Sequence, residues 1–255
     1  MSFGAHRTTR KGNGVILGGD IILYSVAFAA KDDPIAFACR SVRSVCETIM
    51  VELQAEGIEI YLTGKGNYRH DYACDTYPYK GNRKSDKPQH FSALKEYMID
   101  TLGAEVVEGE EADDKLGYMA CQHGHGIATL DKDLYGVPGW HWNWRRRELF
   151  NVSPEDADRF FYKQLITGDS TDNIPGLFKR LGQKAMRSIL DPIEDMYDAA
   201  EMYQYVRNVY SEAFDKVGMC VDEKEAILDD WLLRQGRQLW IRRQEGELWE
   251  FPLGA

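Results

Sequence analysis

The sequence predicts an α/β fold: a largely parallel central sheet with helices on both faces, followed by a mostly helical C-terminal region. Two observations favour this fold class. Over residues 1–152, short apolar runs alternate with segments of helical periodicity, which is typical of βα units. After about residue 153, helical patterns dominate. We therefore expect an α/β core over residues 1–152 and a helical region over residues 153–255.

The core contains five strand candidates and four helix candidates. The apolar runs that predict strands cover residues 14–19, 58–62, 105–107, 126–130 and 140–144. The helical patterns between them cover residues 21–30, 35–56, 89–102 and 112–122. In the last of these, Ala112, Leu116 and Ala120 recur on one helix face, as expected for a helix that packs on a sheet.

A helix start marks the beginning of the C-terminal region. Ser153 suits a helix N-cap, Pro154 suits the first helical position, and Glu155 suits the first turn. Helical patterns continue to about residue 238, interrupted by a loop at 167–177. The final stretch, LWIRRQEGELWEF, predicts two short C-terminal strands around a turn.

Composition excludes several classes of protein. No apolar run approaches the roughly 18 residues that a membrane span requires. The five cysteines include no C-x-x-C pair, which favours reduced thiols over a disulfide framework or a zinc site. The N-terminus has no apolar segment typical of a secretory signal. We expect a soluble, cytoplasmic protein without a membrane partner.

The net charge of −10 does not exclude a nucleic-acid partner, because the charge is unevenly distributed. Residues 191–255 carry 15 acidic and 7 basic residues, whereas residues 1–190 carry 26 and 24. If eight acidic residues in the first part hold metal ions, the rest of that part is positive. A cluster of acidic residues surrounded by a basic surface is compatible with DNA binding.

Acidic residues recur where predicted strands end and in the loop that joins the two regions. They are Asp20, Glu111, Asp113, Asp114, Asp131, Asp133, Asp169 and Asp172. One such residue alone is ordinarily an N-cap or a loop-surface residue. Eight crowded carboxylates, however, cannot all stay ionised without a cation. Oxygen ligands select Mg²⁺ or Mn²⁺, and two such ions about 4 Å apart promote in-line attack on a phosphodiester.

Several motifs occur in the order found in one family. EADD (111–114), TLDKDL (129–134) and GDSTDNIPG (168–176), behind an early strand that ends in an Asp, resemble the 5′-nuclease family. YKGNR (79–83) is similar to the family's arch motif, and YRH (68–70) is similar to the segment before it. The C-terminal LWIRR…LWEFP resembles the tail of T-odd bacteriophage exonucleases. The family includes flap endonucleases, phage 5′-exonucleases and the nuclease domain of bacterial DNA polymerase I.

The resemblance implies hydrolysis of phosphodiester bonds near 5′ ends of duplex DNA and of RNA primers, in DNA replication or recombination. It implies two Mg²⁺ ions, with Mn²⁺ as a substitute. The first ion would be held by Asp20, Glu111, Asp113 and Asp114. The second ion would be held by Asp131, Asp133, Asp169 and Asp172. One ligand of the family is missing, because Thr63 or Gly64 stands where the family has an Asp.

The family's helical arch corresponds to residues 64–95. This segment contains seven Lys and Arg residues but three Asp residues, with tyrosines interleaved among them. Cations and aromatic rings together suit a single-stranded channel. The resemblance gives Lys80 and Arg83 catalytic and DNA-binding roles, with Tyr79 stacking on a base. Residues 168–190 resemble the family's helix–three-turn–helix, which grips duplex DNA and holds K⁺ on carbonyl groups. Its phosphate-binding residues would be Lys179, Arg180, Lys184 and Arg187.

Two other functions compete with this interpretation. Asp131-Lys132-Asp133 and Lys163 superficially match haloacid-dehalogenase-type phosphatases, but that family places its D-x-D after the first strand. A non-catalytic DNA-binding relative would have lost acidic residues of the first ion site, and one is missing here. Phosphate release from a small phosphomonoester would favour the first alternative, and binding of DNA without cleavage would favour the second.

Overall fold

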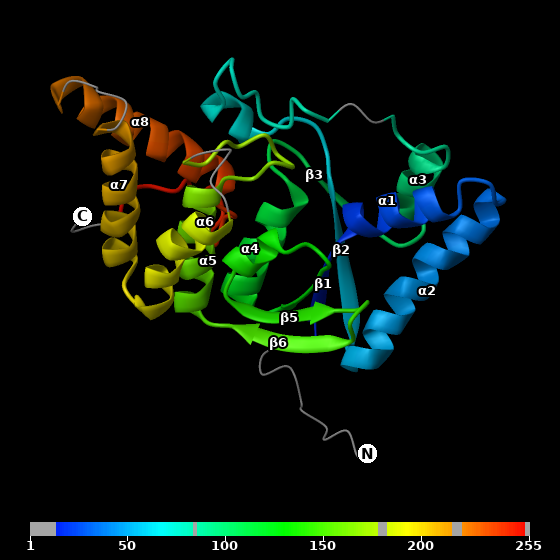
Figure 1. Cartoon of the computed structure of the whole chain (residues 1–255). Coiled ribbons are helices and arrows are strands. Elements are labelled where there is room, and N and C mark those ends of the chain that lie inside the picture. The colour runs from blue at the N-terminus through cyan, green and yellow to red at the C-terminus, as the bar shows by residue number, and fades with distance from the viewer. Residues whose placement is uncertain (1–13, 84–85, 178–182, 216–220, 253–255) are drawn as a thin grey trace. The chain divides into compact units, whose positions relative to one another are not determined.

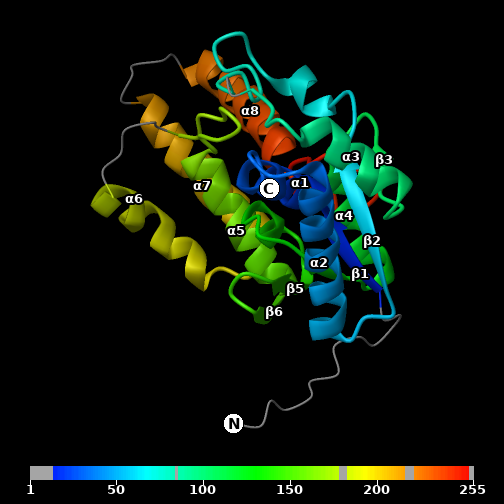
Figure 2. The same cartoon turned by 90° about the vertical axis from the view of Figure 1, so that its right-hand side faces the viewer.

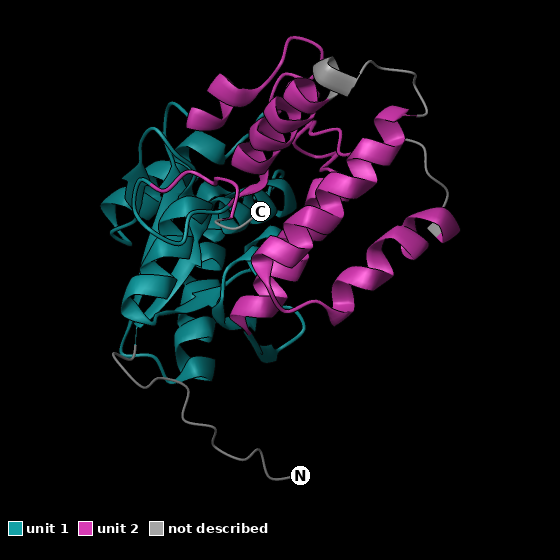
Figure 3. Ribbon diagram, turned by 90° about the vertical axis from the view of Figure 1, so that its left-hand side faces the viewer, with its two compact units in different colours: residues 1–67, 85–152, 241–246 teal, residues 68–84, 153–240, 247–255 magenta. Residues whose placement is uncertain are grey.

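The computed structural model describes residues 14–83, 86–177, 183–215 and 221–252. These residues form two compact units (Figure 3). Unit 1 consists of residues 1–67, 85–152 and 241–246, and unit 2 consists of residues 68–84, 153–240 and 247–255. This division differs from the expected boundary at two places, because part of the expected arch belongs to unit 2 and a short C-terminal stretch belongs to unit 1.

Unit 1 is built around a six-stranded sheet with the strand order β3-β2-β1-β4-β5-β6 (Figure 1). The strands are β1 (Gly14–Gly18), β2 (Gly57–Thr63), β3 (Glu105–Val107), β4 (Gly126–Ala128), β5 (Gly139–Asn143) and β6 (Glu148–Val152). All neighbouring pairs are parallel except β5 with β6. The largely parallel sheet is therefore confirmed, with β6 as an additional antiparallel edge strand.

Helices cover both faces of this sheet, as predicted. The helices of unit 1 are α1 (Gly19–Ala29), α2 (Ile35–Leu53), α3 (Phe91–Asp100) and α4 (Ala112–His123). Helices α1, α2 and α3 contact one another and share one core with Val15 and Leu17 of β1 (Figure 2). Helix α4 shares a second core with Ile16. Because successive side chains point to opposite faces, a strand buried on both faces is apolar throughout.

Unit 2 is helical. It contains α5 (Pro154–Thr167), α6 (Gln183–Leu190), α7 (Ala199–Asp215) and α8 (Val221–Leu239), with short 3₁₀ helices η1 (Tyr68–Tyr72) and η3 (Asp191–Asp195). The N-terminus of α5 has the predicted cap, because the Ser153 hydroxyl accepts a hydrogen bond from the amide of Asp156 at 3.0 Å. The helices enclose one core that includes Phe161, Tyr210 and Trp249.

Two local expectations differ from the structure. The described residues between 64 and 90 contain η1 but no α-helix, so the expected arch is an irregular segment here. Pro78, Pro88 and Gly81 disfavour a continuous helix there. The two expected C-terminal strands do not form, and residues 240–252 are irregular. Their apolar residues Ile241 and Trp249 are buried against helices, so the alternating pattern reflects packing without strand pairing.

No helix among the described residues is both long and apolar enough to cross a membrane.

Apart from the elements above, the described part of unit 1 holds one 3₁₀ helix, η2 (Asp133–Gly136), which follows β4 after a short loop. The carboxyl ends of β1, β3 and β4 of this sheet lead into the segments that carry Asp20, the acidic motif at 111–114, and Asp131 with Asp133.

Candidate active site

The candidate site of unit 1 lies at the carboxyl edge of the sheet. We call Asp20, Thr63, Lys95, Glu111 and Asp113 the sheet-edge cluster. Asp20 is in the first turn of α1, directly after β1, and Thr63 is the last residue of β2. Strands β1 and β2 are adjacent and parallel, which brings the two residues together. The amide of Thr63 donates a hydrogen bond of 2.9 Å to Oδ2 of Asp20.

The carboxyl of Asp20 is partly buried, and this burial affects its pKa. Burial raises the pKa of its carboxyl above the usual value, and the nearby charge of Glu111 raises it further. Hydrogen bonds from Thr63 and the charge of Lys95 act in the opposite direction and lower the pKa. When burial disfavours the ionised form of a carboxyl, a cation that binds beside it stabilises that form.

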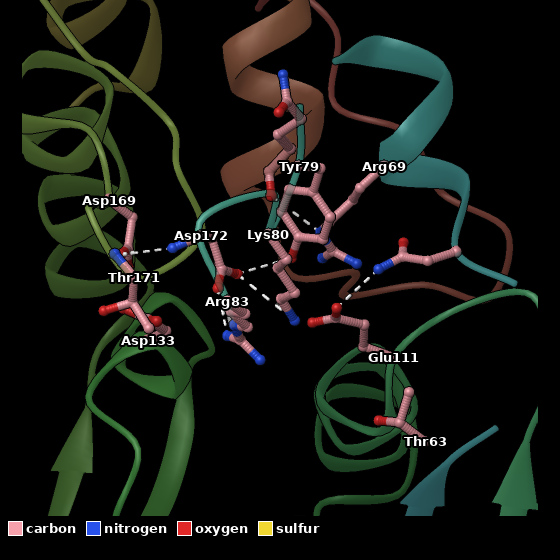
Figure 4. Close-up of polar contacts among 12 residues, drawn as sticks. Thr63, Arg69, Tyr79, Lys80, Arg83, Glu111, Asp133, Asp169, Thr171 and Asp172 are labelled. Carbon is pink, nitrogen blue, oxygen red and sulfur yellow. Dashed lines mark hydrogen bonds and ion pairs between the residues drawn. The ribbon is translucent and has the colours of Figure 1, made fainter. Parts of the chain in front are cut away.

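The start of α4 positions the acidic motif at residues 111–114. Glu111 is the N-cap, and it forms a capping box with Asp114, in which each side chain accepts a hydrogen bond from the other residue's amide. Oε1 of Glu111 also accepts a hydrogen bond of 2.7 Å from the side chain of Asn67 (Figure 4). The sequence of the motif therefore fixes the helix start and the direction of its carboxylates together.

Asp113 and Asp114 have different environments. Asp114 is fully buried, and its two oxygens accept hydrogen bonds from the amides of Glu111 (3.1 Å) and Arg242 (3.2 Å). Asp113 is partly exposed, and its Oδ1 lies 3.8 Å from the point where a Cβ on Gly18 would lie. Asp113 thus faces Gly18, the last residue of β1. Both residues stay predicted ligands, and Asp113 is the more exposed of the two.

Thr63 and Gly64, the two residues at the position of the missing acidic ligand, have different surroundings. A Cβ on Gly64 would lie 2.6 Å from the carbonyl oxygen of Val107, so no side chain fits there. The Thr63 hydroxyl instead accepts a hydrogen bond of 3.0 Å from the amide of Ala112, at the start of α4. Thr63 therefore occupies the position between Asp20 and the acidic motif.

Lys95 is a member of the cluster that the sequence did not reveal. Its ammonium group donates a hydrogen bond of 2.8 Å to the carbonyl oxygen of Thr63, and its charge acts on Asp20. No motif marks this residue, because it lies mid-helix in α3 and reaches the site only through the fold. Glu110, the residue before the acidic motif, is buried and forms an ion pair with Arg242.

The two acidic residues after β4 lie at the start of η2: Asp133 is its first residue, and Asp131 precedes the N-cap Lys132. Oδ1 of Asp131 accepts a hydrogen bond of 3.0 Å from the amide of Asp133, and the amide of Asp131 donates one of 2.9 Å to the hydroxyl of Thr129. Both acidic side chains are partly exposed. They follow the fourth strand of the sheet, whereas Asp20 follows the first strand.

The remaining predicted site residues belong to unit 2. The loop 168–176 is closed at its neck by Gly168 and Gly176, where a Cβ on Gly168 would lie 2.3 Å from the carbonyl oxygen of Ile174. Inside this loop, Oδ1 of Asp169 accepts hydrogen bonds from the amides of Thr171 (2.6 Å) and Asp172 (3.3 Å). Asp169 is buried and shapes the loop that presents Asp172.

Asp172 contacts three residues of the YKGNR motif, and we call these four residues the Asp172 cluster (Figure 4). The hydroxyl of Tyr79 donates a hydrogen bond of 2.7 Å to Oδ2, and Lys80 lies 3.6 Å from the same oxygen. The guanidinium of Arg83 lies 2.5 Å from Oδ1. Tyr79 is buried with its ring edge-to-face against His70, so its predicted stacking face is covered in this structure.

The predicted duplex-binding residues are only partly described. Lys184 and Arg187 are exposed on α6. Met186 and Ile189 of the same helix pack against the core of unit 2, so the helix is anchored by one face and presents its cations on the other. Lys179 and Arg180, and the turn predicted to bind K⁺, lie at or next to residues 178–182, outside the described residues.

The donor chemistry of the sheet-edge cluster fits a hard divalent ion. Its carboxylates offer oxygen atoms alone, and the burial of Asp20 leaves a charge that a cation would stabilise. Among the residues that the structure describes, no three His, Cys, Asp or Glu side chains already converge tightly enough to enclose an ion. The cluster thus supplies ligands of the right kind, and its acidic residues stay predicted ligands.

Comparisons with known proteins bear on the fold. No family model matches the sequence, and no curated protein matches it. Among solved structures, a complex of the bacteriophage T5 D15 flap endonuclease with DNA and metal ions is similar, with a TM-score of 0.59 and 16% identity over 89% of each chain.

Two further solved structures are similar. A mutant of the T5 5′-exonuclease has a TM-score of 0.52 and 16% identity over 89% of this chain and 100% of that chain. The catalytic core of Rad2 in complex with a DNA substrate has a TM-score of 0.51 and 10% identity over 93% of this chain and 79% of that chain. The chain therefore has the α/β fold that the T5 5′-exonuclease and the Rad2 catalytic core share.

Proposed function

We propose that this protein is a metal-dependent 5′-nuclease that hydrolyses phosphodiester bonds near 5′ ends of duplex DNA, as a 5′–3′ exonuclease or flap endonuclease. One observation carries the proposal. Asp20, Glu111 and Asp113 gather at the carboxyl edge of a sheet whose fold is similar to that of a flap endonuclease solved with DNA and metal ions. In α/β sheets this edge is where ligands bind.

The proposed cofactor is a pair of Mg²⁺ ions, with Mn²⁺ as a substitute. Asp20, Glu111 and Asp113 would hold the first ion, and Asp131, Asp133 and Asp169 would contribute to the second. When bound, these ions supply the Lewis-acid chemistry of phosphodiester hydrolysis. Asp114 would complete the ligand set of the first ion and Asp172 that of the second. In this structure both oxygens of each carboxylate contact protein donors.

The protein's own residues bind and orient the DNA. Lys184 and Arg187 would contact duplex phosphates together with Lys179 and Arg180, and a K⁺ ion would bind in the adjoining turn. Lys80 and Arg83 would contact the 5′ end near the scissile phosphate. RNA primers paired with DNA are a second proposed substrate, and we place the protein in DNA replication or recombination in the cytoplasm, including that of a phage-infected host.

Cleavage of defined substrates tests this function. A 5′-flap, a blunt duplex and an RNA-primed duplex, each labelled at the 5′ end, are incubated with the protein in Mg²⁺, Mn²⁺ or EDTA. We expect short 5′ products with either metal and none in EDTA. Asp113→Asn removes one charge at the proposed ion site and should abolish cleavage while leaving duplex binding intact. Normal cleavage by this variant would contradict the ligand assignment.

Thr63 and Lys95 favour one second candidate, a DNA-binding relative without catalysis. The neutral Thr63 stands where the family has an acidic ligand, and the ammonium group of Lys95 contacts the carbonyl oxygen of Thr63. Both features reduce the negative charge that attracts a metal ion. This candidate predicts duplex binding without any product in Mg²⁺ or Mn²⁺. The same assay, run beside an electrophoretic binding measurement, separates the two functions.

A further inference from the structure

A short part of the C-terminal chain, Ile241–Gly246, belongs to unit 1 and packs closely on α4. A Cβ on Gly117 of α4 would lie 2.2 Å from the carbonyl oxygen of Arg242 and 2.9 Å from Cγ2 of Ile241. The same point lies 3.3 Å from Cγ2 of Val137, the residue that follows η2. Helix α4, this C-terminal segment and the end of η2 therefore meet at one position, where only a glycine leaves enough space.

Arg243 of this segment contacts the last residue of η2. Its Nε and Nη2 both donate hydrogen bonds to the carbonyl oxygen of Gly136, at 3.1 and 3.0 Å. The last carbonyl groups of a helix have no partner within the helix, so donors from elsewhere in the fold satisfy them. Because the guanidinium is planar, both of its donors reach the same oxygen and fix its direction.

This contact lies one helical turn from the predicted metal ligands. Asp133 is the first residue of η2 and Gly136 the last, which places them about 6 Å apart along the helix axis. Leu134 between them is fully buried, and the amide of Asp133 donates a hydrogen bond of 3.0 Å to Oδ1 of Asp131. A single 3₁₀ turn has few hydrogen bonds of its own and depends on such external contacts. A contact that fixes Gly136 therefore also fixes the direction of Asp131 and Asp133.

The preceding residue contacts the other acidic segment of unit 1. The amide of Arg242 donates a hydrogen bond of 3.2 Å to Asp114, and its guanidinium pairs with Glu110. Two consecutive arginines thus contact the two segments whose carboxylates the proposed function assigns to different ions. Two divalent ions act together on one phosphodiester when they lie about 3.5–4 Å apart, so their two sets of ligands need a fixed separation.

We propose that Arg243 is a positioning residue, which fixes η2 so that Asp131 and Asp133 are oriented toward the second divalent ion. The proposal rests on the proposed function and gives the C-terminal segment a part in metal binding. The charge of Arg243 alone would repel a nearby cation, so its removal would tighten metal binding if charge were its main effect. A positioning role predicts the opposite sign, because the ligands lose their orientation.

Arg243→Met tests this role, since it keeps an unbranched side chain of similar length and removes both donors. The buried apolar contacts of η2 are unchanged, so the variant should fold. Groups that orient a metal ligand typically change metal affinity by about 10–100-fold, and Arg243 acts one step further away, so we expect a loss of about tenfold. Arg243→Lys keeps one donor, and we expect a smaller loss of about threefold. This second variant tests the role even if Arg243→Met does not fold.

Mn²⁺ binding to the DNA-free protein is measured from the electron paramagnetic resonance signal of free Mn²⁺, with circular dichroism as the check of folding. Asp133→Asn identifies the ion whose Kd depends on this carboxylate. That Kd should rise about tenfold in Arg243→Met, while the Kd of the other ion stays within about twofold. Arg237→Met is the matched control, because Arg237 also donates to a backbone carbonyl, that of Trp249 at 3.2 Å, but in unit 2. Both of its Kd values should stay within about twofold of the parent's.

Two further measurements separate positioning from a general loss of stability. Hydrogen exchange without metal should accelerate over residues 131–137 in Arg243→Met and stay unchanged over α4. In the double variant Asp133→Asn/Arg243→Met, the second change should weaken Mn²⁺ binding no further than Asp133→Asn alone, because Arg243 acts through η2. Cleavage by Arg243→Met should require about tenfold more Mg²⁺ and approach the parent's rate at saturating Mg²⁺.

The outcomes distinguish this role from the proposed function. Unchanged or tighter Mn²⁺ binding in the folded Arg243 variants overturns the positioning role, as does an equal loss in Arg237→Met. If Asp133→Asn leaves Mn²⁺ binding unchanged, the ligand assignment and the positioning role are both wrong. A parent protein that shows the expected Mn²⁺ losses in its variants but cleaves no DNA in Mg²⁺ would refute the nuclease function and leave the positioning role standing.

Discussion

At the scale of single residues, Asp20 shows that this site favours function over stability. Burial and Glu111 raise the pKa of its carboxyl, so its ionised form destabilises the metal-free protein at neutral pH. Asp20→Asn keeps an oxygen for the amide of Thr63 and removes the charge. We expect a higher Tm than the parent in EDTA and a loss of cleavage of at least about 10²-fold. Calorimetry in EDTA and a flap assay in Mg²⁺ check the two effects.

The Tm values of the parent protein and of Asp20→Asn in Mg²⁺ provide the control for that prediction. Added Mg²⁺ should raise the Tm of the parent protein more than that of Asp20→Asn, because binding to the folded state stabilises it by mass action. A lower Tm of the variant in EDTA would show that the charge of Asp20 stabilises the site even without a cation.

Thr63 permits a test of the missing ligand. Thr63→Asp places a carboxylate between Asp20 and the start of α4, so half-maximal cleavage should require less Mg²⁺ than in the parent protein. The metal-free variant should have a lower Tm, because like charges are brought together. Gly64→Asp is the contrasting variant: its Cβ would lie 2.6 Å from the carbonyl oxygen of Val107, so we expect lost stability without a gain in metal affinity. Equal Mg²⁺ requirements of Thr63→Asp and the parent would contradict the position assigned to Thr63.

At the scale of elements, the start of α4 assigns different roles to two neighbouring acidic residues. Asp114→Ala leaves two partly buried amides, those of Glu111 and Arg242, without acceptors, and we expect a loss of about 1–3 kcal/mol in the free energy of unfolding. Asp113→Ala, one residue away and partly exposed, should change stability little but abolish cleavage. Urea unfolding and flap cleavage of both variants measure the contrast. Equal destabilisation by the two changes would refute it.

Helix α6 permits a test of duplex binding. Lys184→Glu reverses an exposed charge on the face opposite the apolar contacts of Met186. We expect weaker duplex binding and a salt dependence whose logarithmic slope is smaller by about one unit per lost phosphate contact. The measurement is Kd against salt concentration, and single-turnover cleavage at saturating DNA should stay near that of the parent protein. Unchanged affinity with slower cleavage would place Lys184 outside the duplex contact.

The strands and helices that could be predicted from the sequence are those with a strong apolar pattern. The runs around Val15 and Ile60 predict strands because both faces are buried, and α4 is predicted by its apolar stripe. Strand β6 was missed, since its only partner is β5 at the sheet edge and its burial is partial. The C-terminal tail, residues 240–252, was predicted wrongly as two strands. Trp240 and Trp249 are buried by helices, and no strand pairs among these described residues.

The candidate site was predicted only as far as motifs extend. Motif order identified the acidic residues, but it could not separate Asp113 from Asp114, whose burial depends on the tail residue Arg242 far away in the sequence. Lys95 was invisible for the same reason, since its approach to Thr63 depends on how α3 packs. The contact between the arch motif and Asp172 joins segments about 90 residues apart, which no local pattern encodes.

At the scale of the whole molecule, the C-terminal tail contributes to both units through separate contacts. Within unit 1, Arg242 donates its amide to Asp114 and pairs with the buried Glu110. Within unit 2, Trp249 packs against Phe161 of α5 and Tyr203 of α7 at ring-centroid distances of 5.3 and 6.1 Å. Each unit therefore depends on a different part of the tail for its stability.

Hydrogen exchange followed by mass spectrometry can separate these two dependences. Arg242→Met leaves Glu110 as a buried charge without its partner, a change that typically costs about 3–5 kcal/mol, so exchange should accelerate in α4 and the strands beside it. Trp249→Ala opens a cavity of similar cost, about 3–5 kcal/mol, and should accelerate exchange in α5 and α7. Truncation after Trp240 should do both. If Trp249→Ala accelerated exchange in α4 as much as in α5, the two units would unfold as one cooperative block and the tail would stabilise the molecule as a whole.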